Sequence, residues 1–371
     1  MGSKKIDWLI IFPDSWMDYS PSLLNFIKMI EEQGETYIIL TYNDHMFKAN
    51  SIDQHNKREL RINPFFAKFL SKVRLLKLFK IIGFIFLIYK EKKFKTEFSR
   101  SVGFDEVGYI IARLFDKNAI YYSLEISNSI LNKVIFRYLK PRLLIIQSEE
   151  RKKYLIKDSN YKNVAYIQNS PILINKPSIK RVYNYKLVYF GNVIKGHGIE
   201  ECIKLLRFLD QETLTIKGLS VTNRKYIDKL IKENEDLIKA GRLCFNFEYI
   251  ENNEIPLYLS QFSIGLCFYD MSLKYKKDFN YLTSPSGKMF YYFQSGLPVI
   301  GIDFPGLVPV KEFNAGVLVP DYSIENLIKA IDKIKSNYAM YSENAIKAAE
   351  HYDYRRMFLQ EKDKIYGAND S

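Results

Sequence analysis

The sequence predicts an α/β protein made of two doubly wound halves that face each other across a cleft. Short apolar segments typical of buried strands alternate with amphipathic segments along most of the chain. The length of 371 residues exceeds one ordinary core and suits two domains of about 150–200 residues. A polar stretch with two prolines, residues 171–185, interrupts the alternation and is the expected linker.

The first half, residues 1–170, begins with a βαβ pattern. Residues 6–12 are apolar on both faces, as in a buried parallel strand. Ser20 and Pro21 suit the N-cap and first position of a helix, Gly34 suits its end, and residues 36–42 form the next expected strand. Further strands are expected at 119–125, 143–148 and 164–170, and helices at 104–115, 127–138 and from 149 onward.

The second half repeats the alternation from residue 186 to about residue 350. Strands are expected at 186–192, 213–218, 244–250, 263–269 and 298–303. Helices are expected at 199–209, 223–239, 255–260, 323–335 and 338–350, with a last one at about 354–365. In paired domains of this kind, ligands bind at the carboxyl ends of the strands that face the cleft.

The formal net charge of +13 is concentrated in a basic insert at about residues 65–100 and the segment before it. Within the insert, Leu75, Leu78, Phe79, Ile82 and Phe86 fall on one helical stripe. The stripe has two competing interpretations: a helix that faces the core, or a helix that lies on an anionic membrane. In the second case the surface would be contacted by six basic residues: Lys72, Arg74, Lys77, Lys80, Lys92 and Lys93. Nucleic acid is disfavoured, because no base-stacking module accompanies the charge.

Cysteine and histidine usage predicts no metal site. The three cysteines are far apart and follow no metal-ligand spacing, which favours reduced thiols in a cytosolic protein. No apolar run reaches the roughly 18–20 residues that span a bilayer.

Two loops in the second half combine glycine, lysine and a following helix. They are GNVIKGHGIEE, with Gly191 and Lys195, and TSPSGKMF, with Ser286, Gly287 and Lys288. Glycine lets the backbone approach a phosphate, and a helix N-terminus offers free N–H groups. Neither loop fits the dinucleotide or Walker pattern. Each glycine alone could be an ordinary turn residue.

Lys288 is the stronger signal. The helix dipole disfavours a cation in the first turn of a helix, so a lysine there needs a nearby anion or an escape to solvent. We expect a bound phosphate to supply the anion.

The second half resembles the donor domain of GT-B glycosyltransferases, in particular the bacterial family-4-like enzymes of surface-polysaccharide synthesis. VYFGNVIKGHGIEECIKLL resembles the opening strand, glycine loop and helix of that domain, and SPSGKMFYYFQSGLPVIG its Pro-Ser-x-Lys segment. NAGVLVPDYSIENLIKAI resembles the segment that follows. The resemblance implies two Rossmann-like domains, with donor binding in residues 186–350 and a C-terminal helix, residues 351–371, that returns toward the N-terminal domain.

The resemblance also implies roles for individual residues. Lys288 and Lys195 would contact the donor diphosphate, and the backbone near Gly191, Ser286 and Gly287 would approach it. Independently of the resemblance, Asp270 is a candidate for contact with the donor sugar, because it directly follows the strand expected at 263–269. Two departures stand out: Asn192 occupies a position where many members have arginine, and Tyr291 and Thr283 replace the paired glutamates of retaining members.

Acids at strand ends in the first half are candidates for the base that deprotonates an acceptor. They are Asp14, Asp18 and Glu125. Each also has a structural interpretation: Glu125 as an acid at a helix start, and the two aspartates as turn formers.

The expected activity is transfer of a sugar from a nucleotide-diphosphate sugar, with UDP favoured, to a saccharide acceptor that is lipid-linked. Retention of configuration is favoured over inversion, and neither cofactor nor metal is required. The protein would be cytoplasmic and attached peripherally to the inner face of the membrane. The alternatives are a glycosyltransferase with a soluble protein-glycan acceptor, a sugar-nucleotide epimerase, which the four histidines disfavour, and a non-catalytic binding or scaffold subunit.

Overall fold

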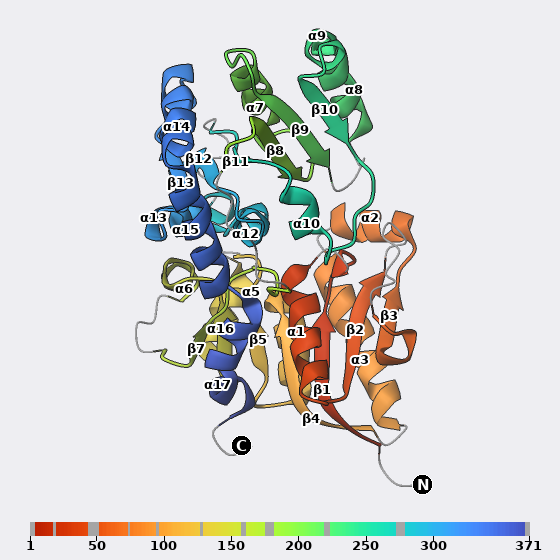
Figure 1. Ribbon diagram of the computed structural model, residues 1–371. Coiled ribbons are helices and arrows are strands. Elements are labelled where there is room, and N and C mark those ends of the chain that lie inside the picture. Colours follow the sequence, from red (N-terminus) through yellow and green to blue (C-terminus); the bar gives the residue numbers. More distant parts are fainter. Residues whose placement is uncertain are drawn as a thin grey trace. The chain divides into compact units, whose positions relative to one another are not determined.

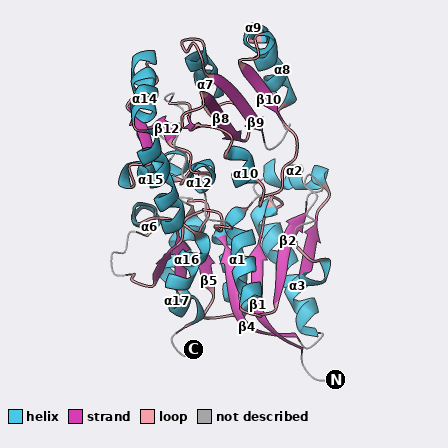
Figure 2. Ribbon diagram, in the orientation of Figure 1, coloured by secondary structure: helices cyan, strands magenta, loops and turns pink. Residues whose placement is uncertain are grey.

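The computed structural model describes residues 4–17, 20–43, 52–72, 75–93, 96–126, 129–156, 161–174, 182–218, 223–271 and 279–367. The chain divides into two compact units. Unit 1 comprises residues 1–169 and 354–371, and unit 2 comprises residues 170–353. Each unit contains a parallel sheet with helices packed around it (Figure 1, Figure 2). The predicted fold class, two doubly wound α/β domains, is confirmed.

Within the described residues, the sheet of unit 1 has seven parallel strands in the order β3-β2-β1-β4-β5-β6-β7. The strands are β1 (Lys4–Phe12), β2 (Tyr37–Asn43), β3 (Lys57–Arg61), β4 (Thr96–Phe104), β5 (Ile120–Tyr122), β6 (Leu143–Ile146) and β7 (Val164–Tyr166). The helices are α1 (Pro21–Glu32), the short η2 (Gln54–Asn56), α2 (Pro64–Lys72), α3 (Leu76–Lys93), α4 (Asp105–Phe115), α5 (Ile130–Tyr138), α6 (Glu149–Leu155), α16 (Tyr354–Gln360) and α17 (Lys362–Tyr366).

The start of unit 1 follows the sequence closely. Ser20 caps α1, and its hydroxyl accepts a hydrogen bond from the Leu23 amide at 3.4 Å. Gly34 adopts a φ of +72° just after the helix, a conformation that glycine accepts without strain. Two strands of unit 1, β3 and β4, were not predicted, and neither was β13 (Gly316–Val319) in unit 2. The miss of β4 matters more, because it pairs with β1 and β5 in the middle of the sheet although its first half is polar.

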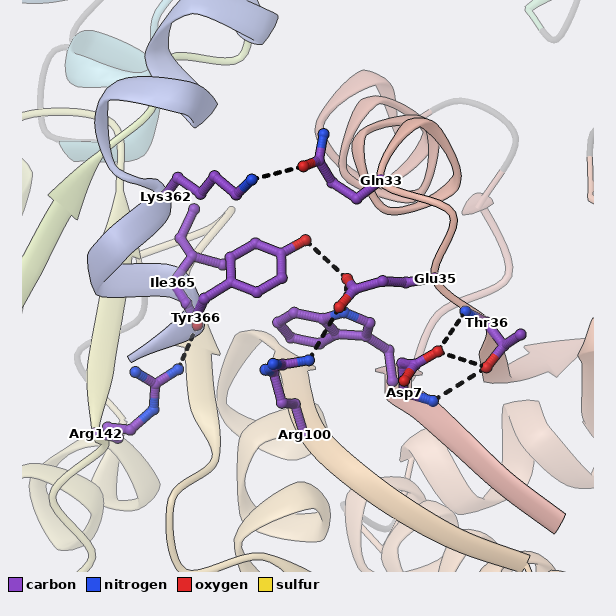
Figure 3. Close-up of polar contacts among 10 residues, drawn as sticks. Asp7, Gln33, Glu35, Thr36, Arg100, Arg142, Lys362, Ile365 and Tyr366 are labelled. Carbon is purple, nitrogen blue, oxygen red and sulfur yellow. Dashed lines mark hydrogen bonds and ion pairs between the residues drawn. The ribbon is translucent and has the colours of Figure 1, made fainter. Parts of the chain in front are cut away.

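The polar half of β4 is explained by Glu35. The Glu35 carboxylate accepts a hydrogen bond from Arg100 of β4 at 3.0 Å, from the Trp8 indole at 2.7 Å and from the Tyr366 hydroxyl at 2.7 Å (Figure 3). The Arg100 guanidinium also lies over the Tyr366 ring, 4.8 Å from its centroid. A charged residue is therefore accommodated in a central strand because helix α17 supplies part of its surroundings.

The C-terminal helices are fixed to unit 1 by further contacts. Arg142 donates a hydrogen bond to the Ile365 carbonyl oxygen at 2.5 Å (Figure 3). It donates another to the Lys364 carbonyl oxygen at 2.8 Å. Phe358 of α16 is fully buried and meets Phe26 of α1 edge to face, with 5.8 Å between ring centroids. The predicted return of the C-terminal helix to the N-terminal domain is thus confirmed.

Within the described residues, the sheet of unit 2 has six parallel strands in the order β10-β9-β8-β11-β12-β13. The strands are β8 (Lys186–Gly191), β9 (Thr213–Gly218), β10 (Leu243–Asn246), β11 (Ile264–Cys267), β12 (Val299–Ile302) and β13 (Gly316–Val319). The helices are α7 (Ile199–Leu206), α8 (Arg224–Glu233), α9 (Glu235–Lys239), α10 (Ile255–Leu259), α11 (Phe279–Thr283), α12 (Gly287–Gln294), the short η3 (Pro305–Leu307), α13 (Val308–Glu312), α14 (Ile324–Ser336) and α15 (Tyr338–His351). The helix predicted at 223–239 is two helices that meet at Asn234.

Candidate functional site

Unit 2 gathers the predicted phosphate-binding loops at the carboxyl ends of β8 and β11. Helix α12 begins at Gly287 with Ser286 as its N-cap, as the sequence predicts. The Ser286 hydroxyl does not cap the helix; it accepts a hydrogen bond from the Tyr269 hydroxyl at 2.7 Å. A side chain added to Gly287 would meet no atom within 4 Å, so open space lies beside the first turn of α12.

Lys288 lies between two tyrosine rings. Its Nζ is 4.5 Å from the ring centroid of Tyr189 and 4.7 Å from that of Tyr269. The ammonium also donates a hydrogen bond to the Tyr189 hydroxyl at 3.4 Å. Burial lowers the pKa of Lys288 from its usual value. Among the described residues no carboxylate pairs with it, so the two π faces supply most of its electrostatic compensation.

The loop after β8 passes directly beside Lys288. Gly191 has a φ of +136°, and a Cβ at this position would lie 3.6 Å from Cε of Lys288. The carbonyl of Asn192 accepts a hydrogen bond from the Tyr189 hydroxyl at 2.7 Å, while its side chain is exposed. Lys195, in the same loop, is also exposed. The structure thus places Gly191 and Asn192 close to Lys288, with Lys195 on the surface of the same loop.

His197 joins this group and was not predicted. Its Nδ1 lies 3.2 Å from the Asn192 carbonyl oxygen and 3.3 Å from the Tyr189 hydroxyl. Burial and the charge of Lys288 lower the pKa of His197 to about 4, so the ring is neutral near pH 7. The signal in the sequence is its place between Gly196 and Gly198, in the same loop as Lys195.

The loops after β8 and β11 are tied together. The Asp270 amide donates to the Gly196 carbonyl at 2.8 Å, and the Tyr281 hydroxyl bonds to the carbonyls of both residues. A Cβ on Gly198, which has a φ of +68°, would lie 2.5 Å from Cβ of Phe268. This close approach requires glycine, and it fixes the predicted sugar contact, Asp270, beside the first glycine loop.

Tyr291 stands three residues after Lys288 on α12. Its ring meets Phe190 of β8 edge to face, with 5.5 Å between centroids. Burial raises the pKa of its phenol to about 12, so the hydroxyl keeps its proton. At the other position where a glutamate was expected, the Thr283 hydroxyl donates to the Phe279 carbonyl at 2.7 Å.

In unit 1, the predicted acids lie at the carboxyl edge of the sheet. Asp14 pairs with Lys80 of α3 at 3.0 Å, and the same ammonium donates to the Pro13 carbonyl at 2.7 Å. Glu125 is exposed just after β5. Asp18 lies outside the described residues.

Asp105 was not predicted and lies at the same edge. Its Oδ1 accepts hydrogen bonds from the amides of Leu124 at 2.8 Å and Glu125 at 3.0 Å. Burial, together with the charges of Asp14 and Glu125, raises the pKa of Asp105 to about 8. Asp105 was not among the candidates because β4, the strand that ends beside it, was not predicted.

Helices α2 and α3 expose a large apolar surface, which we call the α2–α3 face. All five stripe residues predicted in the insert are exposed, from 37% for Phe79 to 67% for Phe86. The α2–α3 face is formed by Phe65, Phe66, Phe69, Leu75, Leu78, Phe79, Ile82, Phe86 and Tyr89. The interpretation of the stripe as core-facing is therefore wrong. The opposite side of α3 packs inward through Phe84 and Ile88, which are fully buried.

The basic residues predicted to face a membrane are placed differently from one another. Lys72 is exposed at the end of α2. Lys77 pairs with Glu106, and Lys80 is buried against Asp14 and the Tyr42 ring, so the Lys80 ammonium is not available to a surface. Arg74 and the side chains of Lys92 and Lys93 lie outside the described residues. None of the helices in the described parts of the chain could cross a bilayer, and those parts bring together no group of three or more potential metal ligands.

No family model and no curated protein matches the chain. Solved structures match nearly all of it. Sucrose-phosphate synthase of Thermosynechococcus elongatus is 14% identical, with a TM-score of 0.68 over 98% of this chain and 100% of that one. Anabaena HepE in complex with UDP-glucose is 13% identical, with a TM-score of 0.68 over 97% and 99%. WaaG, described as a glycosyltransferase involved in lipopolysaccharide biosynthesis, is 13% identical, with a TM-score of 0.59 over 97% and 100%. The chain therefore has the GT-B fold.

Proposed function

We propose that this GT-B protein is a glycosyltransferase that moves a sugar from a UDP-sugar to a saccharide acceptor. The observation that carries the proposal is Lys288, a cation held between two tyrosine rings at the start of α12 with no carboxylate partner among the described residues. Such an arrangement lacks one anion, and a nucleotide diphosphate would supply it. UDP-glucose bound to HepE supports the choice of UDP.

The surroundings of Lys288 suit a leaving diphosphate. The first turn of α12 offers backbone N–H groups beside the open space at Gly287, and exposed Lys195 can reach an anion from the loop after β8. Positive charge and oriented N–H groups stabilise the charge that develops on the leaving group, and the proposal needs no metal for this. Tyr291, with its proton retained, would replace the missing glutamate as a hydrogen-bond partner of the ribose.

A thermal-shift screen of nucleoside diphosphates tests the donor assignment. A ligand at about 100 times its Kd stabilises the protein by roughly 2.7 kcal/mol, which is readily seen as a rise in Tm. We expect UDP to raise Tm in the wild type and to have little effect on Lys288→Met. Lys204→Met, an exposed lysine on α7, is the matched control and should respond like the wild type. Absence of a shift with any diphosphate would reject the donor site.

We further propose a lipid-linked acceptor and peripheral attachment to the cytoplasmic face of the membrane. The α2–α3 face supports this, because nine large apolar side chains there are exposed and Lys68 and Lys72 are exposed among them. Apolar insertion would provide the anchor, and the lysines would favour anionic lipid. The role of WaaG in lipopolysaccharide biosynthesis agrees with an acceptor of this class.

Vesicle sedimentation separates this proposal from a soluble acceptor. Phe65, Phe69 and Phe86 are 87%, 57% and 67% exposed, so replacing all three with serine should not disturb the fold. Full burial of one such side chain contributes about 1.5–3 kcal/mol, so the triple variant should bind vesicles of phosphatidylglycerol and phosphatidylcholine at least roughly 100-fold more weakly. Because insertion is apolar, the wild type should remain bound to the vesicles at roughly 0.5 M salt, a concentration that screens purely ionic attachment. Equal binding of both proteins would reject the membrane surface.

The acceptor side and the stereochemistry complete the proposal. Glu125 is the favoured group for contact with the acceptor hydroxyl, because it is exposed at the carboxyl edge of the sheet. The family resemblance favours retention of configuration, and NMR of the anomeric proton of the product decides between retention and inversion. A protein that binds UDP but transfers no sugar to water or to any saccharide would instead be a binding or scaffold subunit.

A further inference from the structure

Three polar side chains hold a short segment that follows β5. The segment is Ser123–Glu125, and it belongs to neither strand nor helix. Gln147, at the end of β6, donates through Nε2 to the Ser123 carbonyl at 2.8 Å. Arg151 of α6, with no exposed surface, donates to the Leu124 carbonyl at 2.9 Å.

Asp105 holds the other side of the same segment. One oxygen, Oδ1, accepts from the amides of both Leu124 and Glu125. Asp105 has a φ of +51° at the junction of β4 and α4, a conformation uncommon outside glycine, asparagine and aspartate. The junction is tight, because a Cβ on Gly103 would lie 2.2 Å from the backbone of Gly108.

Buried polar groups are costly to place unless they are bonded, and bonds from several buried side chains to one short segment restrict its backbone. Here such groups converge on three residues whose last member, Glu125, presents an exposed carboxylate at the edge of the sheet. Ordinary loop residues in this position could satisfy their backbone groups with water. These hydrogen bonds therefore hold the backbone that carries the Glu125 side chain in one position.

We propose that Asp105 is a positioning residue that fixes the backbone of Glu125, so that the Glu125 carboxylate meets the acceptor hydroxyl at a defined place. The inference rests on the proposed function and deepens it on the acceptor side. The two hydrogen bonds that Asp105 accepts here both come from backbone amides of the segment. Gln147, just after β6, and Arg151 of α6 hold the carbonyl groups of the same segment.

Two substitutions at position 105 isolate this role. Both Asp105→Asn and Asp105→Gly accept a positive φ, so neither strains the junction. Only asparagine keeps an Oδ1 that can accept from the two amides. Asp105→Gly should speed hydrogen exchange of the Leu124 and Glu125 amides about tenfold or more, since two hydrogen bonds of about 1 kcal/mol each are lost, and Asp105→Asn should leave it near the wild-type rate.

Turnover gives the functional readout. The assay uses water as the acceptor and, as the donor, the UDP-sugar that gives the largest thermal shift. In Asp105→Gly, kcat should fall roughly tenfold or more while the KM of the donor stays within about twofold of the wild-type value. The reason is that a misplaced Glu125 carboxylate affects the reacting step and not donor binding. Asp105→Asn should keep most of kcat. Asp116→Ala is the control: Asp116 holds the Asn118 amide at 2.7 Å at the far end of α4, and its loss should leave kcat unchanged.

Each result decides one part of the inference. Equal loss of kcat in the asparagine and glycine variants would show that the carboxyl group of Asp105 matters for a reason other than its two hydrogen bonds to the amides, and would overturn the positioning role. Unchanged amide exchange in Asp105→Gly would overturn it independently of any activity. A wild type that neither binds nor turns over a UDP-sugar would instead reject the proposed function, and the role of Glu125 with it.

Discussion

Replacing Lys288 with methionine should have two effects of opposite sign. Methionine keeps an unbranched chain of similar length and removes the charge. Without a ligand, the ammonium belongs to a half-buried lysine and is compensated by two rings and one hydroxyl. With a diphosphate present, the same ammonium gains its missing partner. The variant should therefore be more stable than the wild type when empty and weaker in binding.

The size of each effect follows from the contacts. Desolvation of an ion costs several kcal/mol in real proteins, and two cation–π contacts return about 1–2 kcal/mol each. The remainder is of the order of 1 kcal/mol, which corresponds to a rise in Tm of about 2–4 °C for a unit of this size. Loss of a charge-assisted contact to phosphate costs about 1.5–3 kcal/mol, so the Kd of UDP should rise roughly 10- to 150-fold.

Differential scanning calorimetry of the empty protein and titration calorimetry with UDP measure the two effects. Lys195→Met is the control for stability, because Lys195 is exposed and its removal should leave the Tm of the empty protein unchanged. A fall in Tm together with an unchanged Kd would refute the reasoning. That outcome would mean that the lysine stabilises the fold through its rings and has no part in anion binding.

Two other predictions concern unit 1. Glu35→Gln removes the charge that holds Arg100, Trp8 and Tyr366. Because Glu35 and Arg100 are each only 17% exposed, we expect the free energy of unfolding to fall by about 2 kcal/mol and Tm, measured by scanning calorimetry, to fall by roughly 4–8 °C. A fall in Tm below about 1 °C would mean that α17 is not anchored by Glu35. Asp105 has a pKa raised to about 8 in the folded state, from 3.8, so the folded protein binds its proton more tightly than the unfolded chain does. The contribution of Asp105 to stability therefore falls as pH rises from about 4 to about 8. Over that interval the Tm of Asp105→Asn should increase relative to that of the wild type. A constant difference in Tm would contradict the raised pKa of Asp105.

The donor side was largely predictable because its signals are local. Ser286, Gly287 and Lys288 are consecutive, and a turn, an N-cap and a first-turn cation can be recognised without knowing the fold. The compensation of Lys288 was not predictable. Tyr189 lies on β8 and Tyr269 just after β11, and only the pairing of those two strands brings both rings to one ammonium.

The acceptor side was less predictable, because its critical strand does not look like one. β4 contains exposed Glu97 and half-buried Arg100, so its pattern lacks the continuous apolar run of a central parallel strand. Arg100 is tolerated there only because Glu35 and Tyr366 surround it, and Tyr366 comes from the far end of the chain. With β4 missed, Asp105 could not be placed beside Glu125.

The sequence by itself determined the two α/β halves, the glycine loops and the helix that begins near Lys288, since each depends on residues close together in the chain. It also determined that one stripe of α3 is apolar. The tertiary structure alone decided which way that stripe faces. Phe84 and Ile88, on the other side of α3, pack against the rest of unit 1, so the stripe remains exposed. An apolar periodicity records which residues share a side of a helix, whereas burial depends on what the rest of the chain brings against that side.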